Sequence, residues 1–123
     1  MQEHAGHLAD LDEILFLPRL DEYAAKVTTL RAADMSNRQT EAADHNARSL
    51  DEVLSHLRRA RAAIVTRIEA LDAEAFAGVA FHPRLHVPMR LVDMMFFHAE
   101  HDDYHLASIT EVLRAGSREE PPR

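Results

Sequence analysis

The sequence predicts an all-α protein built from three long helices. Glycine is scarce, with three residues in 123, and runs of β-branched residues are short. Three long stretches instead place apolar residues three and four positions apart, the spacing that brings side chains onto one helix face. A chain of this length forms one domain. We expect the helical domain over residues 1–116 and a disordered tail over residues 117–123, which hold two prolines and four charges.

The first helix is expected from about residue 3 to residue 25. His7, Leu11 and Ile14 fall on one face of this stretch, so their side chains are expected to point inward. Pro18 lies in the same run and has no backbone N–H to donate. We therefore expect the helix to kink at Pro18 or to divide there into two segments.

A long connection is expected over the polar residues 26–48. Helical spacing disappears in this stretch, apart from a short helical turn expected near residues 41–45. A connection of this length without strong structure of its own is usually functional or mobile. It could cover one end of a pocket.

The second long helix is expected to begin after Ser49. Ser49 followed by Glu52 is a capping box, in which each side chain satisfies a free backbone donor of the first helical turn. The apolar stripe that follows is formed by Leu50, Val53, Leu54, Leu57, Ala60, Ile64, Ile68 and Leu71. Four arginines lie mostly off this stripe and are interpreted as a solvated face: Arg58, Arg59, Arg61 and Arg67.

The last helix follows a connection over residues 73–87 that contains Gly78 and Pro83. Pro88 suits the first turn of a helix, where its missing N–H leaves no carbonyl without a partner. Gly116 suits the left-handed residue that ends many helices. We therefore expect a helix from about Pro88 to Gly116.

One face of this last helix carries histidines within an apolar stripe. The stripe consists of Leu91, Met94, His98, His101, His105, Ile109 and Val112. Histidines on a solvent-facing helix normally lie opposite the apolar stripe, not within it. Three imidazoles that point into a core are most economically explained by a bound metal ion.

His101 and His105 lie one helical turn apart and can present two imidazoles to one cation. With nine histidines in the chain, random placement gives roughly 0.6 such pairs, so the spacing alone is weak support. A second pair, His82 and His86, is interrupted by Pro83 and is not helical. The inward position of His101 and His105 strengthens the metal interpretation.

A third ligand is expected from another helix. The candidates are His98, one turn earlier on the same helix, and His4 and His7 on the first helix. Three ligands from one straight helix approach an ion from one side only, which suits tetrahedral coordination poorly. His7 shares the inward face of the first helix, so we favour His7. We interpret His98 as a residue that either contacts the ligand residues or lines the pocket.

Asp102 also falls on the inward arc of the last helix. It is the candidate catalytic residue, either as an acceptor for an imidazole N–H or as a proton carrier beside the metal. The alternative interpretation is an ordinary charge on the helix surface.

Composition excludes several classes of protein. The formal charge of −7 and the lack of a basic patch argue against nucleic-acid binding. No apolar run is long enough to span a membrane and no signal peptide is apparent, so a cytoplasmic location is expected by elimination. With no cysteine, this chain has no thiolate ligand or cysteine nucleophile. The zincin motif His-Glu-x-x-His, the Glu-x-x-His motif of di-iron bundles and Gly-rich phosphate loops are missing.

Four segments in order resemble the DinB/YfiT-like superfamily. They are residues 6–11 (GHLADL), 33–38 (ADMSNR), 82–85 (HPRL) and 99–106 (AEHDDYHL). The resemblance implies an up-up-down-down four-helix bundle that often forms homodimers. It begins at the family's second helix, so we expect a bundle that lacks the family's first helix. Either the start is truncated or a neighbouring subunit covers the exposed face.

The resemblance also implies a site and an activity. The family holds a divalent ion, typically zinc or nickel, on one histidine of its second helix and two of its last, which fall on His7, His101 and His105. It includes transferases and isomerases that use low-molecular-weight thiols. We expect a metal-dependent thiol S-transferase or hydrolase acting on a small molecule. The alternative is a non-catalytic metal-binding or stress-related helical module.

Overall fold

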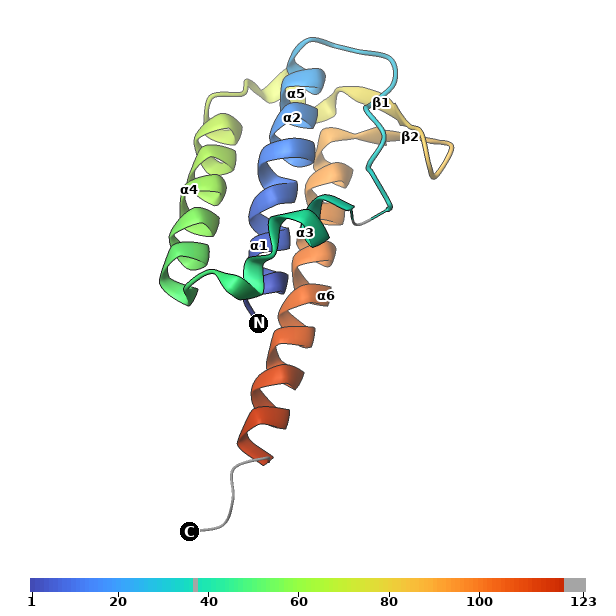
Figure 1. Ribbon diagram of the computed structural model, residues 1–123. Helices are drawn as coiled ribbons and strands as arrows, with labels where there is room; N and C mark the ends of the chain where they lie inside the picture. The colour runs from blue at the N-terminus through green and yellow to red at the C-terminus, as the bar shows by residue number, and fades with distance from the viewer. Residues whose placement is uncertain (37, 119–123) are drawn as a thin grey trace.

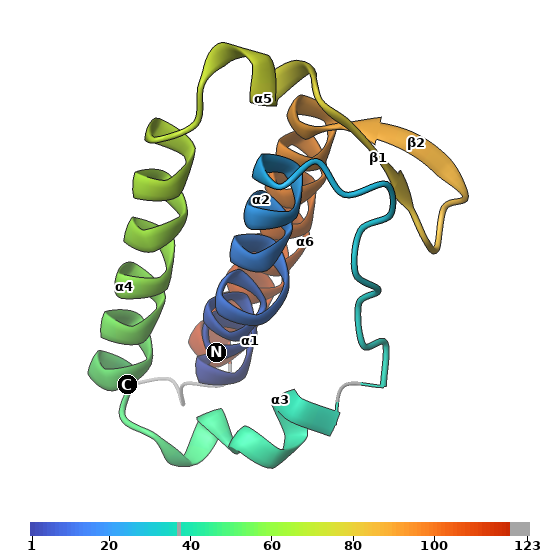
Figure 2. The ribbon, with the colours of Figure 1, turned by 90° about the horizontal axis from the view of Figure 1, so that it is seen from above.

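The computed structural model describes residues 1–36 and 38–118, and these are mostly helical (Figure 1). The first helical rod consists of α1 (Gln2–Leu11), a π-helical turn (Asp12–Phe16) and α2 (Leu17–Ala24). The other long helices are α4 (Leu50–Glu69) and α6 (Leu91–Arg118), and the short ones are α3 (Arg38–Ala43) and α5 (Ala73–Ala77). The first rod lies between α4 and α6 (Figure 2). The predicted all-α fold is confirmed.

Pro18 interrupts the regular α-helix of the first rod, as predicted, but the rod continues past it as a helix. Pro18 cannot donate to the carbonyl of Ile14, four residues earlier, so a regular α-helix would lose one hydrogen bond there. The chain instead forms a π turn just before it, in which the Leu17 N–H donates to the carbonyl of Asp12. The rod continues through this turn with one residue more than an α-helix would use.

The long connection returns the chain from one end of the bundle to the other. The first rod and α4 run in the same direction and α6 runs opposite to both (Figure 1), so the chain must cross the full length of the bundle between them. Along this path the Phe81 N–H donates to the carbonyl of Thr28, and the Leu30 N–H donates to the carbonyl of Phe81. The expected helical turn is present as α3 and a 3-10 turn, His45–Ala47.

The 3-10 turn is fixed to α1 by His45, which is 2% exposed. Its Nε2 lies 2.7 Å from Asp10 Oδ2, and its ring lies over the backbone of Gly6. A Cβ atom at Gly6 would lie 2.2 Å from His45 Cγ, closer than any normal contact. Gly6 is therefore needed so that the connection can reach α1.

We expect Gly6→Ala to lower the free energy of unfolding by about 1–3 kcal/mol, because the added methyl group displaces the His45 ring from its buried position. Urea denaturation measures the effect. The matched control is Gly116→Ala, where a Cβ meets nothing within 4 Å. That change should leave stability unaltered or raise it by up to about 1 kcal/mol, because alanine favours a helix more than glycine. Equal stabilities for the two variants would contradict the role of Gly6.

The α4 helix follows the prediction closely at its start and along its buried side. Ser49 Oγ accepts a hydrogen bond from the Glu52 N–H at 3.2 Å, the first half of the capping box. Val53, Ala60 and Ile64 are its buried residues and face the first rod. Arg58 and Arg59 are exposed, as expected of a solvated face.

A β-hairpin that the sequence interpretation missed replaces the start of the expected last helix. β1 (Val79–His82) pairs antiparallel with β2 (Val87–Arg90), and Pro88 lies opposite Phe81. The expected position of Pro88 in a first helical turn is therefore wrong. Among the described residues β2 pairs only with β1, so a residue without an N–H is tolerated on its outer edge.

The expected end of the last helix at Gly116 is also wrong, because α6 continues to Arg118. None of the three glycines, all of which lie among the described residues, has a positive φ angle. The rest of the predicted disordered tail, residues 119–123, lies outside the described residues.

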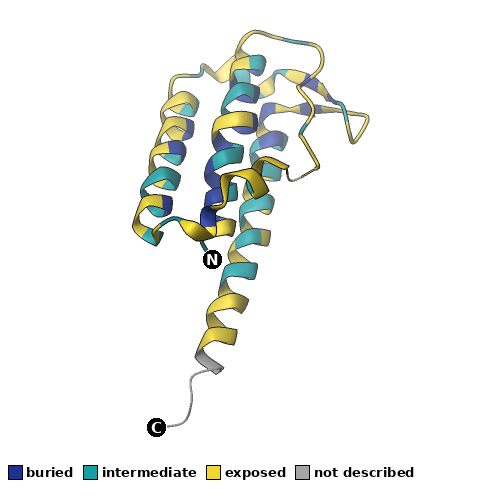
Figure 3. Ribbon diagram, viewed as in Figure 1, coloured by how far each residue is buried: buried dark blue, intermediate teal, exposed yellow. Residues whose placement is uncertain are grey.

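The core lies where the first rod, α4, the hairpin and the start of α6 meet. Its buried members include Leu15, Phe16, Leu20, Tyr23, Ile64, Leu91 and Met94. The last turns of α6 extend past the other helices (Figure 1), and residues 110–116 there are exposed (Figure 3). Within the described part of the chain, no helix is both long and apolar enough to cross a membrane.

Candidate metal centre

The three predicted ligand histidines lie together where α1 faces α6. His7, His101 and His105 each offer a ring nitrogen, and these three atoms all lie within 4.8 Å of one another. The ring centroids of His7 and His105 are 4.7 Å apart, as are those of His101 and His105. All three residues are half-buried. Imidazoles from two distant parts of the chain therefore form one cluster that could hold a metal ion.

Two of the rings are oriented by partners outside the cluster. Thr40 Oγ1, on α3, lies 2.8 Å from His7 Nδ1, and His4 Nδ1 lies 3.0 Å from His105 Nδ1. These contacts occupy the Nδ1 atoms and leave Nε2 of His7 and of His105 available for a cation. His4 was one of the candidate ligands in the sequence. In the structure its Nδ1 instead contacts Nδ1 of His105, the nitrogen that is not available to the cation. Thr40 carried no recognisable signal in the sequence.

The third ring has an unsatisfied atom. His101 Nδ1 is buried and has no hydrogen-bond partner among the described residues. An orphaned buried nitrogen costs free energy unless something binds it. The donor set of three imidazoles also suits zinc, nickel and related ions. Both the geometry and the chemistry of the cluster therefore fit a divalent metal ion.

The cluster is kept neutral at physiological pH. Burial lowers the pKa of His7 and His101 below the ordinary value, and burial together with the neighbouring His101 and His7 lowers the pKa of His105 to about 4. Neutral imidazoles with free lone pairs are the form that binds metal. The site therefore needs little or no proton release before it can bind an ion near pH 7.

These pKa shifts predict an acid-sensitive metal-free protein. An unfolded histidine titrates near 6.5, whereas His105 in the fold titrates at about 4. Between these values the unfolded chain binds protons that the folded chain does not, so stability falls as pH decreases from about 6.5 to about 4. With chelator present, the urea midpoint should drop across this range, and His105→Gln should flatten the drop. The same pH dependence in the variant and in the unaltered protein would contradict this origin.

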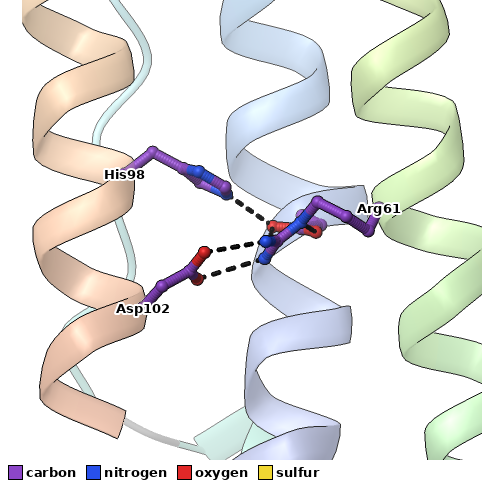
Figure 4. A network of polar contacts seen from close by, with 4 residues as sticks. Arg61, His98 and Asp102 are labelled. Atoms are coloured by element: carbon purple, nitrogen blue, oxygen red, sulfur yellow. Dashed lines mark hydrogen bonds and ion pairs between the residues drawn. The ribbon is translucent and has the colours of Figure 1, made fainter. Parts of the chain in front are cut away.

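A second polar cluster joins three helices (Figure 4). Asp12, in the π turn, is 1% exposed. Its Oδ2 accepts from Arg61 Nε at 2.8 Å, and its Oδ1 accepts from His98 Nε2 at 2.8 Å. Arg61 also donates to both oxygens of Asp102, at 2.7 and 3.1 Å. The cluster ties α4 to both the first rod and α6.

This network alters the interpretation of two residues. Arg61, assigned with its neighbours to a solvated face, is instead half-buried between two carboxylates, so that assignment is wrong. Asp102 faces inward as expected, but its carboxylate accepts from Arg61 and not from an imidazole. Its charge still acts on the cluster, since it raises the pKa of His101 and His105 against the larger effect of burial. The catalytic role of Asp102 stays a prediction.

A cavity of about 400 Å³ opens beside the histidines. His7 and His101 line it, together with the apolar side chains of Leu11, Leu15 and Phe97. The long connection supplies another wall through residues 32–35, so the expectation that it could cover a pocket agrees with its position. The volume is within the range of small-molecule sites.

Comparison with known proteins identifies a family. The family model described as the DinB superfamily matches residues 1–109. No curated protein and no solved structure matches the chain. The match spans every element described above except the last turns of α6.

Proposed function

The chain belongs to the DinB superfamily, and from this premise we propose that it is a divalent-metal-dependent enzyme, a thiol S-transferase or hydrolase acting on a small molecule. The observation that carries the proposal is the position of the histidine cluster at the wall of a cavity. Structural zinc sites are closed by four protein ligands, whereas catalytic sites have three and leave one position open. Three imidazoles beside an apolar cavity correspond to the second arrangement.

We propose that His7, His101 and His105 hold the ion, zinc or nickel. Such an ion, when bound, acts as a Lewis acid and lowers the pKa of a water or thiol. Thr40 and His4 fix the rings of His7 and His105, and the apolar cavity wall excludes water from the reacting groups. Because the chain has no cysteine, the thiol of a transferase reaction has to come from a low-molecular-weight cosubstrate.

The proposal is tested with purified protein loaded with Zn²⁺ or Ni²⁺. Transfer is assayed with small thiols and 1-chloro-2,4-dinitrobenzene, and hydrolysis with p-nitrophenyl esters. We expect the loaded protein to accelerate one of these reactions and chelator to remove the activity. A metal-loaded protein that is inert in both assays would count against catalysis.

The non-catalytic alternative is distinguished by stability. The cluster joins α1 to α6, so a purely structural ion would contribute to the free energy of folding. In that case chelator should lower the thermal midpoint by many degrees while both assays remain negative. The homodimer implied by the family resemblance stays a prediction.

A further inference from the structure

We propose that the cavity beside the histidine cluster binds a small organic carboxylate. Its acidic group would lie against Arg19, His82 and Arg84, and its apolar body between them and the histidines. This inference rests on the proposed function and deepens it by naming the class of substrate. Four observations support it: a buried cation without an acidic partner, a buried N–H donor, the surrounding charges and the apolar cavity lining.

Arg19 is a buried cation that lines the cavity and has no ion-pair partner among the described residues. It is 1% exposed, and no carboxylate of the described residues lies within 4.0 Å of its guanidinium. Nε and Nη2 donate to the carbonyl of Arg31 at 3.3 and 2.9 Å, while Nη1 faces the sulfur of Met94 at 3.7 Å. A guanidinium stays charged in proteins, and an uncompensated buried charge is costly. An anion in the cavity would compensate it.

His82 supplies a second buried donor on the same wall. It is 2% exposed and lines the cavity. Its Nδ1 accepts hydrogen bonds from the backbone N–H groups of Arg84 and Leu85, at 3.2 and 3.1 Å. An acceptor Nδ1 carries no proton, so the proton of the neutral ring is on Nε2. The hairpin turn thus fixes the tautomer that offers an N–H donor.

The charges around this end of the cavity favour an anion. Arg84 lines the cavity, is exposed at its edge and has no carboxylate within 4.0 Å among the described residues. Two acidic residues are near. Glu22 is engaged by the backbone N–H and Nε of Arg31, and Asp34, which also lines the cavity, is exposed and accepts from the Ser36 N–H. Arg19 and Arg84 therefore remain without direct neutralisation.

The rest of the cavity fits the body of such a ligand. Leu11, Leu15, Phe16 and Phe97 line the same cavity as His7 and His101. An apolar group here would exchange water for carbon contacts, while two oxygens of a carboxylate would meet the guanidinium and the imidazole donor. The acidic group would therefore orient the molecule, with its other end toward the histidine cluster.

The test compares 3-phenylpropanoate with its neutral amide, 3-phenylpropanamide, as probes. Binding to the full chain as purified is measured by calorimetric titration. We expect the carboxylate to bind at least tenfold more tightly than the amide. Arg84→Gln, at an exposed position, and Arg19→Met, which keeps an unbranched apolar side chain, should each reduce this preference several-fold. Thermal melts establish that both variants are folded.

Arg90→Gln is the matched control. Arg90 lies on the same hairpin, is exposed, pairs with Asp93 and does not line the cavity, so its loss should leave the preference unchanged. If the preference for the carboxylate came instead from its coordination to a metal ion, all three substitutions would leave that preference unchanged. Loss of preference in either cavity variant supports the inference.

Equal affinities for the two probes, or a preference that survives in both cavity variants, would overturn it. Failure of this inference is distinguishable from failure of the proposed function. A protein that binds metal and is active but does not prefer the carboxylate contradicts the inference alone. A protein that prefers the carboxylate but is inactive when metal-loaded contradicts the proposed function alone.

Discussion

His101→Ala is expected to weaken binding of Zn²⁺ or Ni²⁺ by more than about 100-fold, because removing even an outer partner of a metal ligand commonly costs 10- to 100-fold. His101 is the member of the cluster with the strongest individual case, since its Nδ1 is buried and unpartnered. Its loss would leave His7 and His105 as the only cluster imidazoles. Competition against a chromogenic chelator measures the affinity, and elemental analysis measures the bound metal.

The control for this change is His86→Asn. His86 is exposed in the hairpin turn with φ of 57°, a conformation that asparagine tolerates better than most residues. It takes no part in the cluster, so its replacement should leave metal affinity unaltered. The assignment of the centre fails if His101→Ala binds metal as tightly as the unaltered protein.

The largest effect on stability is expected from Asp12→Ala, which should lower the free energy of unfolding by about 3 kcal/mol. Removing one partner of a buried ion pair typically costs about 3–5 kcal/mol, because the remaining charge is left uncompensated. The lower end of this range applies here, because the Arg61 side chain is 35% exposed and keeps its ion pair with Asp102. His98 would also lose its acceptor.

Asp21→Ala tests whether this cost comes from burial. Asp21 pairs with Arg67 at the surface, where both side chains are about half exposed. An exposed pair contributes about 0–1 kcal/mol, so this variant should change the urea midpoint little. Comparable losses for the two variants would mean that Asp12 has no special role.

Periodicity accounts for what could be predicted from the sequence. The long helices and the capping residue Ser49 leave local patterns that survive without any tertiary information. The cluster of His7, His101 and His105 was predicted because two ligands share a helix face and the third shares the inward face of another helix. The family resemblance pointed to the same residues.

The parts that were missed depend on contacts between distant residues. Arg61 looks like its exposed neighbours in the sequence, and only the fold brings Asp12 and Asp102 to either side of it. The hairpin was missed because its strands are four residues each and Pro88 suits a helix start equally well. His45 carries no local sign that Gly6, far away in sequence, provides the space for its ring.

The π turn sets the rotational phase between the two halves of the first rod. Arg19 follows His7 by 12 positions, which in a regular α-helix would place the two side chains about 120° apart around the axis. The extra residue of the turn subtracts about 100°, so both reach the same cavity. A rod that was α-helical throughout, with the same 12 positions between the two residues, would instead turn the guanidinium about 100° away from the histidines. The π turn is thus what allows Arg19 and His7 to line one cavity.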